Sequence, residues 1–153
     1  MRKKPAERIA KLPLLSAALR HLRDAEHLAD PSNPHGSLDQ AYHLAGFGPE
    51  CARKAAIAVS WANTPLGHDL GEDAEFVLEL ALALAPAASR YEVRGWEQAY
   101  PALAAWKPDC RYRETGTYQR SRTERLLHEA WLAATEIMAA MWADGRVTQE
   151  ALQ

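Results

Sequence analysis

The sequence has few cysteines, no long apolar run and no segment with strand periodicity, and each absence excludes a class of protein. Two cysteines occur in 153 residues, and Cys51 and Cys110 lack Cys-x-x-Cys spacing and form no disulfide framework. The longest uncharged run, residues 55–67, is too short to cross a bilayer and contains Pro65. The basic N-terminus lacks the apolar core of a signal peptide. We therefore expect a cytoplasmic protein with reduced thiols and no membrane partner.

Lysine and arginine are absent between Lys54 and Arg90, although the whole chain is nearly balanced at a net charge of −2. This balance gives no argument from total charge for a nucleic-acid or membrane partner. The gap holds acidic residues that indicate either a docking surface for a basic partner or an exposed helix: Asp69, Glu72, Asp73, Glu75 and Glu79.

Length and composition predict a single globular domain. Hydrophobic residues make up 48% of the chain and charged residues 25%, which is ordinary for a globular protein and argues against disorder. We expect one domain over residues 1–153, with a basic N-terminal arm (1–12), a core (about 14–143) and a C-terminal tail (144–153).

Apolar residues recur at helical spacing along most of the chain, and no internal repeat is found. The predicted long helices cover residues 13–28, 37–61, 71–85 and 117–143, with shorter helices near residues 5–11 and 96–106. Capping residues support three of the starts: Ser37 with Gln40, Asp69 with Glu72, and Thr117. The pattern predicts an all-α fold, a four-helix-type bundle with one or two additional short helices.

The helix predicted over residues 37–61 carries mostly small apolar residues, which let neighbouring helices approach closely and favour a central position. Gly46-Phe47-Gly48-Pro49 interrupts its middle. Because Pro49 cannot donate a main-chain hydrogen bond and its ring crowds the preceding turn, we expect a kink. The kink is predicted to open a gap beside His43, where we expect a ligand.

Three groups of residues, taken in order along the chain, resemble a known family. Tyr42, Glu50 and Lys54 lie on the helix of residues 37–61, Gly67-His68-Asp69-Leu70 follows it, and Arg111-Tyr112 precedes the last helix. Over about residues 14–143 this order is similar to HEPN domains, the helical bundles of prokaryotic toxin–antitoxin and nucleotidyltransferase-associated systems. The resemblance implies an HEPN-like bundle, a homodimer and a nucleotidyltransferase-type partner protein. The Gly-Phe-Gly-Pro interruption departs from the more regular helix of that family.

Many HEPN proteins are metal-independent ribonucleases that act as dimers and carry an arginine followed a few residues later by a histidine. Arg122 and His128, with five residues between them, fit this pattern, so the resemblance implies that they are catalytic and need no cofactor. An arginine fork can hold the scissile phosphate, and an imidazole can move the proton of a 2′-hydroxyl. The alternative is a surface ion pair between Glu124 and His128, four residues apart. Ala130 replaces the tyrosine that a nucleotidyltransferase modifies in some systems, so we do not expect that form of control.

A second candidate site consists of His43, Glu50, Lys54 and His68, and is expected to bind a nucleotide or another small anion. His43 and Glu50 lie two helical turns apart on one face, while Glu50 and Lys54 form an (i, i+4) pair. The alternative is structural, with the Glu50–Lys54 pair supporting the helix and His68 tying a loop to the bundle.

Arginines and tyrosines gather before and within the last helix: Arg111, Tyr112, Arg113, Tyr118, Arg120, Arg122 and Arg125. Guanidinium groups bind phosphates and aromatic rings stack on bases, so Arg111, Arg113, Arg120 and Arg125 are predicted to contact phosphate or RNA. The alternative is a solvated helix start whose charge Glu114 and Glu124 partly offset.

No metal site is predicted, although the chain has six histidines. The Glu-x-x-His motif of di-metal bundles and the His-Glu-x-x-His motif of zinc enzymes are both missing. His21, Asp24 and His27 drift around a predicted helix and supply two ligands at most.

Large apolar residues in the last helix exceed what one helix needs for its core and predict a homodimer: Trp131, Met138, Met141 and Trp142. We therefore predict a metal-independent, toxin- or defence-type ribonuclease that acts as a homodimer on RNA. The alternative is a non-catalytic module that binds a nucleotide or a partner protein through the face of His43, Glu50 and Lys54.

Overall fold

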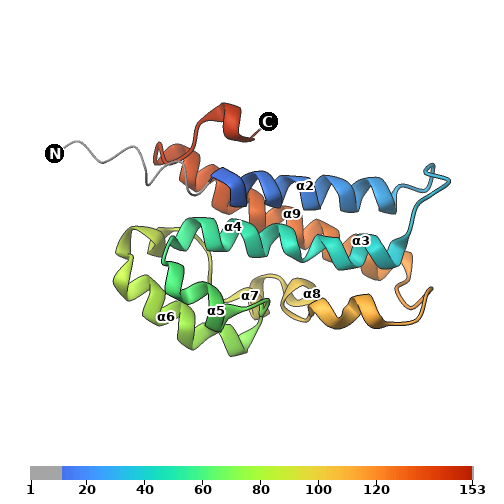
Figure 1. Cartoon of the computed structure of the whole chain (residues 1–153), viewed down its shortest axis with the longest axis horizontal. Helices are drawn as coiled ribbons and strands as arrows, with labels where there is room; N and C mark the ends of the chain where they lie inside the picture. The colour runs from blue at the N-terminus through green and yellow to red at the C-terminus, as the bar shows by residue number, and fades with distance from the viewer. Residues whose placement is uncertain (1–11, 153) are drawn as a thin grey trace.

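The computed structural model describes residues 12–152 and contains helices but no strand within that range. Three helical elements form the core (Figure 1): α2 (Leu12–Ala29), the broken helix made of α3 (Leu38–Ala45) and α4 (Phe47–Ile57), and α9 (Arg120–Ala143). α2 packs along both α3 and α4, and α9 packs against all three. The prediction of an all-α fold with a bundle-like core is confirmed.

Shorter elements lie along one side of this core and connect α4 to α9 (Figure 1). With η marking a 3-10 helix, they are η1 (Ser60–Ala62), α5 (Asn63–Leu66), η2 (Glu72–Ala74), α6 (Glu75–Leu84), η3 (Pro86–Arg90), α7 (Trp96–Ala99), α8 (Pro101–Ala104) and η4 (Pro108–Tyr112). α8 packs on α9 and η4 packs on α3, whereas α6 makes its main contacts with α5 and the 3-10 turns around it. The core therefore has three helical elements, and α6, predicted as a fourth main helix, stands beside them.

One continuous cluster of buried side chains joins the bundle to this side layer. Leu15 and Leu22 contribute from α2, Ile137 from α9, and Trp96 and Trp106 from the segment that includes α7 and α8. Burying such large apolar side chains supplies most of the favourable free energy of folding. None of the helices in residues 12–152 is both long and apolar enough to span a membrane. The predicted arm lies almost wholly outside the described residues, as does the helix predicted near residues 5–11.

The helix predicted over residues 37–61 is broken at Gly46, as its sequence predicts. Ser37 caps the first half, because its side-chain oxygen accepts a hydrogen bond from the main-chain N–H of Gln40 at 3.3 Å. The second half ends at Ala58, which has a φ of 56° in the left-handed region.

The two glycines at the break make room for side chains of the same chain. Gly46 has a φ of −70°, an ordinary helical value, so a glycine is required there for space and not for backbone freedom. A Cβ on Gly46 would lie 2.1 Å from the ring of Trp106, and one on Gly48 would lie 2.5 Å from Leu22. Close packing thus occupies the break, and the prediction of an open gap is wrong here.

Two predicted helix caps are wrong, because the side chains concerned bind elsewhere. The hydroxyl of Thr117 donates to the main-chain oxygen of Glu114, and α9 begins at Arg120. The carboxylate of Asp69 accepts a hydrogen bond from Gly71 N–H at 2.8 Å, and the 3-10 turn before α6 has no side-chain cap.

Residues 144–152, within the predicted tail, are docked on the bundle. Val147 is buried, and η5 (Gln149–Leu152) packs on α2. Arg146 donates to the main-chain oxygens of Ala56 at 3.0 Å and Ala55 at 3.4 Å. These contacts attach the end of the chain to α4.

The large apolar residues of α9 serve mainly the protein's own core. Met138 and Met141 are buried, and Trp131 is partly buried against the same cluster. Trp142 is the exception, with 55% of its surface exposed. The argument for a dimer through an apolar face of α9 is therefore wrong, because the bundle covers most of that face.

Candidate functional site

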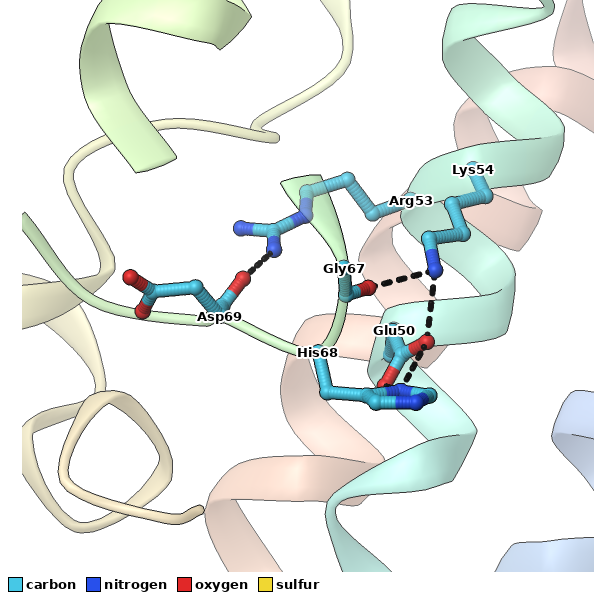
Figure 2. A network of polar contacts seen from close by, with 6 residues as sticks. All are labelled: Glu50, Arg53, Lys54, Gly67, His68 and Asp69. Atoms are coloured by element: carbon cyan, nitrogen blue, oxygen red, sulfur yellow. Dashed lines mark hydrogen bonds and ion pairs between the residues drawn. The ribbon is translucent and has the colours of Figure 1, made fainter. Parts of the chain in front are cut away.

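A network of charged groups joins α4 to the loop of residues 67–71 (Figure 2). The buried carboxylate of Glu50 accepts a hydrogen bond from Lys54 Nζ at 2.7 Å and contacts His68 Nδ1 at 2.9 Å. Lys54 Nζ also donates to the main-chain oxygen of Gly67 at 2.6 Å. Three of the four residues of the predicted anion site, Glu50, Lys54 and His68, are therefore together, and they bind one another.

Arg53 extends this network into the core. Its guanidinium donates to the main-chain oxygen of Asp69 (Figure 2). It also lies over the ring of Trp96, 4.6 Å from the ring centroid. Arg53 is 1% exposed, and burial lowers the pKa of its guanidinium to about 10, while nearby Glu50, Asp69 and Glu75 oppose this shift. The group stays charged at neutral pH, so these carboxylates balance a buried cation.

Asp69 fixes the loop through its side chain as well. Its Oδ1 accepts hydrogen bonds from Gly71 N–H at 2.8 Å and from Lys107 Nζ at 2.9 Å. Burial raises the pKa of this carboxyl, but the hydrogen bonds from Gly71 and Lys107 and the nearby Arg53 outweigh burial and lower it below its ordinary value. The loop that carries His68 is thus tied to the bundle at several points, as the structural alternative expects.

His43, the fourth residue of the predicted anion site, lies apart from this network. The ring of Phe47 stands edge-on to His43 and to His68, with centroids 5.1 and 5.5 Å away, and tilted to His21 at 5.5 Å. Burial lowers the pKa of both His21 and His43. Phe47 therefore occupies the space beside His43 where a ligand was expected.

Neither cysteine has the environment of a reactive thiol. Cys110 Sγ lies 3.5 Å from His43 Nδ1, but burial raises the pKa of its thiol to about 11. Burial also raises the pKa of Cys51 to about 11. Both thiols are therefore protonated at neutral pH and are poor nucleophiles. Within residues 12–152, no group of three or more His, Cys, Asp or Glu side chains is arranged to hold a metal ion.

The start of α9 presents the second candidate region. The guanidinium of Arg122 lies over two tyrosine rings, 5.4 Å from the centroid of Tyr42 and 5.3 Å from that of Tyr118. The two rings stack on each other with centroids 3.8 Å apart. Asp39, at the start of α3, accepts main-chain hydrogen bonds from Gly116 at 2.7 Å and Tyr118 at 3.0 Å, which fixes the preceding loop. Arg122 itself remains exposed.

His128 is exposed on α9 and makes no hydrogen bond or ion pair with the described residues. Glu124 pairs with Arg120 at 3.3 Å, so the alternative of a Glu124–His128 ion pair is wrong. Arg122 and His128 are six positions apart on a continuous helix, which places them about 120° apart around its axis. Their side chains leave α9 in different directions.

Of the other arginines predicted to contact RNA, one is used inside the fold. Arg120 donates to the main-chain oxygen of Ala29 at 2.8 Å, which joins the start of α9 to the end of α2. Arg111 is exposed on η4, Arg113 is exposed directly after η4 and lies 3.9 Å from the carboxylate of Asp109, and Arg125 is exposed on α9. Arg113 and Arg122 both lie close enough to Tyr118 to oppose the rise in pKa that burial causes in its hydroxyl. The exposed side chains of Arg111, Arg113, Arg122 and Arg125 are hereafter called the arginine surface, and Tyr118 is the neighbour that Arg113 and Arg122 share.

Sequence reasoning missed Arg53, Lys107 and the stacking of Tyr42 on Tyr118. Arg53 stands beside Lys54 in the sequence, and its position as a basic residue on the apolar face of a central helix is the signal that could have identified it. No sequence signal links Tyr42 to Tyr118, because 76 positions separate them and only packing joins them.

No protein-family model, curated protein or solved structure matches this chain. The function therefore has to be inferred from the chemistry of the two regions, the charged network on α4 and the arginine surface.

Proposed function

We propose that this chain is an HEPN-like helical protein that binds the phosphate backbone of RNA with its arginine surface. The observation that carries the proposal is the position of Arg122, exposed and stacked over Tyr42 and Tyr118. Aromatic rings that hold a guanidinium reduce the freedom it loses when it binds a phosphate. Arg113 lies near the same ring of Tyr118, so more than one cation faces this part of the surface.

In the ribonuclease form of this proposal, Arg122 holds the scissile phosphate and His128 moves the proton of the 2′-hydroxyl. Because the two side chains leave α9 about 120° apart, the reaction requires a second chain that completes the cleft. The proposed assembly is therefore a homodimer, and no metal or cofactor takes part.

Binding is tested by fluorescence anisotropy with labelled single-stranded and hairpin RNA in EDTA, over a range of salt concentrations. Replacing Arg122 with alanine is expected to weaken binding and to lower the slope of log affinity against log salt by about 0.7–0.9. Arg94→Ala is the matched control, since Arg94 is also exposed but lies before α7 and pairs with Glu79 of α6 at 3.8 Å. Equal losses for the two variants would contradict the proposal.

Cleavage is tested separately, because binding does not require it. We expect RNA cleavage in EDTA by the wild-type protein, and its loss in His128→Ala without a matching loss of RNA affinity. If the wild-type protein binds RNA but does not cleave it, the protein is an RNA-binding protein and the ribonuclease form of the proposal is wrong. If the folded protein does not bind RNA, both the RNA-binding proposal and its ribonuclease form are wrong.

The second candidate function is a non-catalytic module that binds a partner protein, such as a nucleotidyltransferase-type protein, or a nucleotide. A nucleotide at Lys54 would have to compete with Glu50 and Gly67, which already accept its hydrogen bonds at 2.7 and 2.6 Å. A protein partner is the better supported form, because α6 has large exposed apolar side chains. A nucleotide-dependent rise in melting temperature that Lys54→Ala abolishes and Lys107→Ala retains would favour the nucleotide instead.

A further inference from the structure

Three tyrosines lie beside the arginine surface, and the ring of one of them is open to solvent. Tyr42 and Tyr118 are 3% and 8% exposed, stack on each other and lie under the guanidinium of Arg122. Tyr112 is 76% exposed. Tyr42 and Tyr118 are therefore used in packing, whereas Tyr112 presents a ring on which a flat ligand can stack.

The segment that carries Tyr112 is held on the bundle. η4 packs on α3, and the buried Sγ of Cys110 lies 3.5 Å from Nδ1 of His43 on α3. The main-chain N–H of Arg113 donates to the main-chain oxygen of Cys110 at 3.2 Å, which closes the turn around Tyr112. A ligand that stacks on Tyr112 thus meets a ring on an ordered backbone, and this lowers the entropic cost of binding.

Positive charge surrounds this ring. The guanidinium of Arg111 lies over the ring of Tyr112, 4.8 Å from the ring centroid. Among residues 12–152, no second cation and no aromatic ring contacts Tyr112. Arg113 follows it and is exposed, and Asp109, 3.9 Å from Arg113, offsets part of the charge. A guanidinium covers one face of a ring, so the opposite face of Tyr112 is available.

An open aromatic ring between two arginines suits an unpaired nucleobase. A base inside a duplex has both faces against its neighbours, whereas an unpaired base has a face that can stack on tyrosine. The phosphates on either side of such a base are ligands for the adjacent guanidinium groups. Arginines without an open ring would bind the phosphates of a duplex and of a single strand alike.

We infer that the arginine surface selects single-stranded RNA, with an unpaired base stacked on the open face of Tyr112 and the flanking phosphates bound by Arg111 and Arg113. The inference rests on the proposed RNA binding and adds to it the class of RNA and the residue that distinguishes it. Every base has a π-face, so stacking is tolerant of base identity. The selectivity is therefore for unpaired bases and not for a sequence.

Fluorescence anisotropy in EDTA tests the inference with a labelled, unstructured single strand of RNA and the blunt duplex of the same sequence. We expect the wild type to bind the single strand about tenfold more tightly than the duplex. Tyr112→Ala is expected to lose this preference, because its affinity for the single strand falls while its affinity for the duplex stays within about twofold. Tyr112→Phe keeps the ring and is expected to keep the preference.

A ribose-phosphate oligomer without bases isolates the stacking contact. The wild type is expected to bind it about tenfold more weakly than the normal single strand, whereas Tyr112→Ala binds the two equally. Tyr112→Ala should also keep the slope of log affinity against log salt, since it removes no phosphate contact.

Trp142→Ala is the matched control. Trp142 is another exposed aromatic residue, 55% exposed, and lies about 30 Å along α9 from Arg122. This variant is expected to bind all three probes as the wild type does, and the melting temperature confirms that each variant is folded.

Two kinds of failure are distinguishable. If the wild type binds the single strand, the duplex and the oligomer without bases equally, or if Tyr112→Ala keeps the single-strand preference, the inference is overturned and phosphate binding by the arginine surface stands. An equal loss of the preference in Trp142→Ala would overturn it as well. A wild-type protein that binds none of the three probes would contradict the proposed function itself, and the inference with it.

Discussion

Arg53 on α4 and Arg122 on α9 both lie over aromatic rings, but their surroundings differ. Arg53 is buried, donates to the Asp69 carbonyl oxygen and has three carboxylates within electrostatic reach. Arg122 is exposed, and its main contacts are the faces of Tyr42 and Tyr118. An arginine side chain therefore stabilises the fold at position 53 and remains available for binding at position 122.

The comparison extends to the neighbours of each arginine. Around Arg53, the charged groups of Glu50, Lys54 and Asp69 are satisfied by one another and by the main chain. A ligand there would have to replace hydrogen bonds that already exist, which removes most of the gain from binding. Around Arg122, the neighbouring arginines are exposed, so a phosphate can reach their guanidinium groups without breaking buried hydrogen bonds.

The largest expected effect comes from removing the buried arginine. Arg53→Met should lower the free energy of unfolding by about 3–5 kcal/mol, because it removes the buried cation that balances the nearby carboxylates and leaves the Asp69 carbonyl oxygen without its donor. Urea unfolding measures this change. Arg125→Met is the control on the exposed side and should stay within about 0.5 kcal/mol of the wild type. Similar losses for both variants would break the distinction between the two regions.

Close packing at the helix break gives the next effect. Gly46→Ala should destabilise the protein by about 1–3 kcal/mol, since the added Cβ would lie 2.1 Å from the ring of Trp106. Helix propensity alone predicts the opposite, a gain of about 1 kcal/mol. Thermal unfolding followed by circular dichroism measures the sign, and a stabilised variant would show that Trp106 can move and open a space there.

Removing the exposed arginine should matter little for stability. Arg122→Ala is expected to lower the free energy of unfolding by about 0.5–1 kcal/mol, the value of a solvent-exposed contact between a cation and an aromatic ring. The measurement is the same urea titration as for Arg53→Met. A loss near that of Arg53→Met would assign Arg122 to the fold and weaken its proposed role in phosphate binding.

The smallest effect concerns pH. Burial lowers the folded-state pKa of His43, so the unfolded chain binds a proton more readily, and protonation favours unfolding. Stability is therefore full above the ordinary histidine pKa of about 6.5 and falls as the pH decreases below it. In His43→Gln, the loss of unfolding free energy between neutral and mildly acidic pH should be smaller than in the wild type. An unchanged loss would show that His43 does not contribute.

The amino-acid sequence determines the helical class, the approximate position of each long helix and the break at Gly46. These features depend on local physics: apolar spacing, the missing N–H of Pro49 and the capping oxygen of Ser37. It also brings Glu50 and Lys54 together, because residues four apart on a helix are neighbours.

Tertiary structure alone decided which polar groups are already bound and which remain free. Arg53 meets Trp96, and Tyr42 meets Tyr118, across long separations in sequence that helical spacing does not relate. Likewise, packing buried Met138 and Met141 of α9 and left the outer face of α6 in solvent. Burial depends on which helices become neighbours, and that is a property of the whole chain.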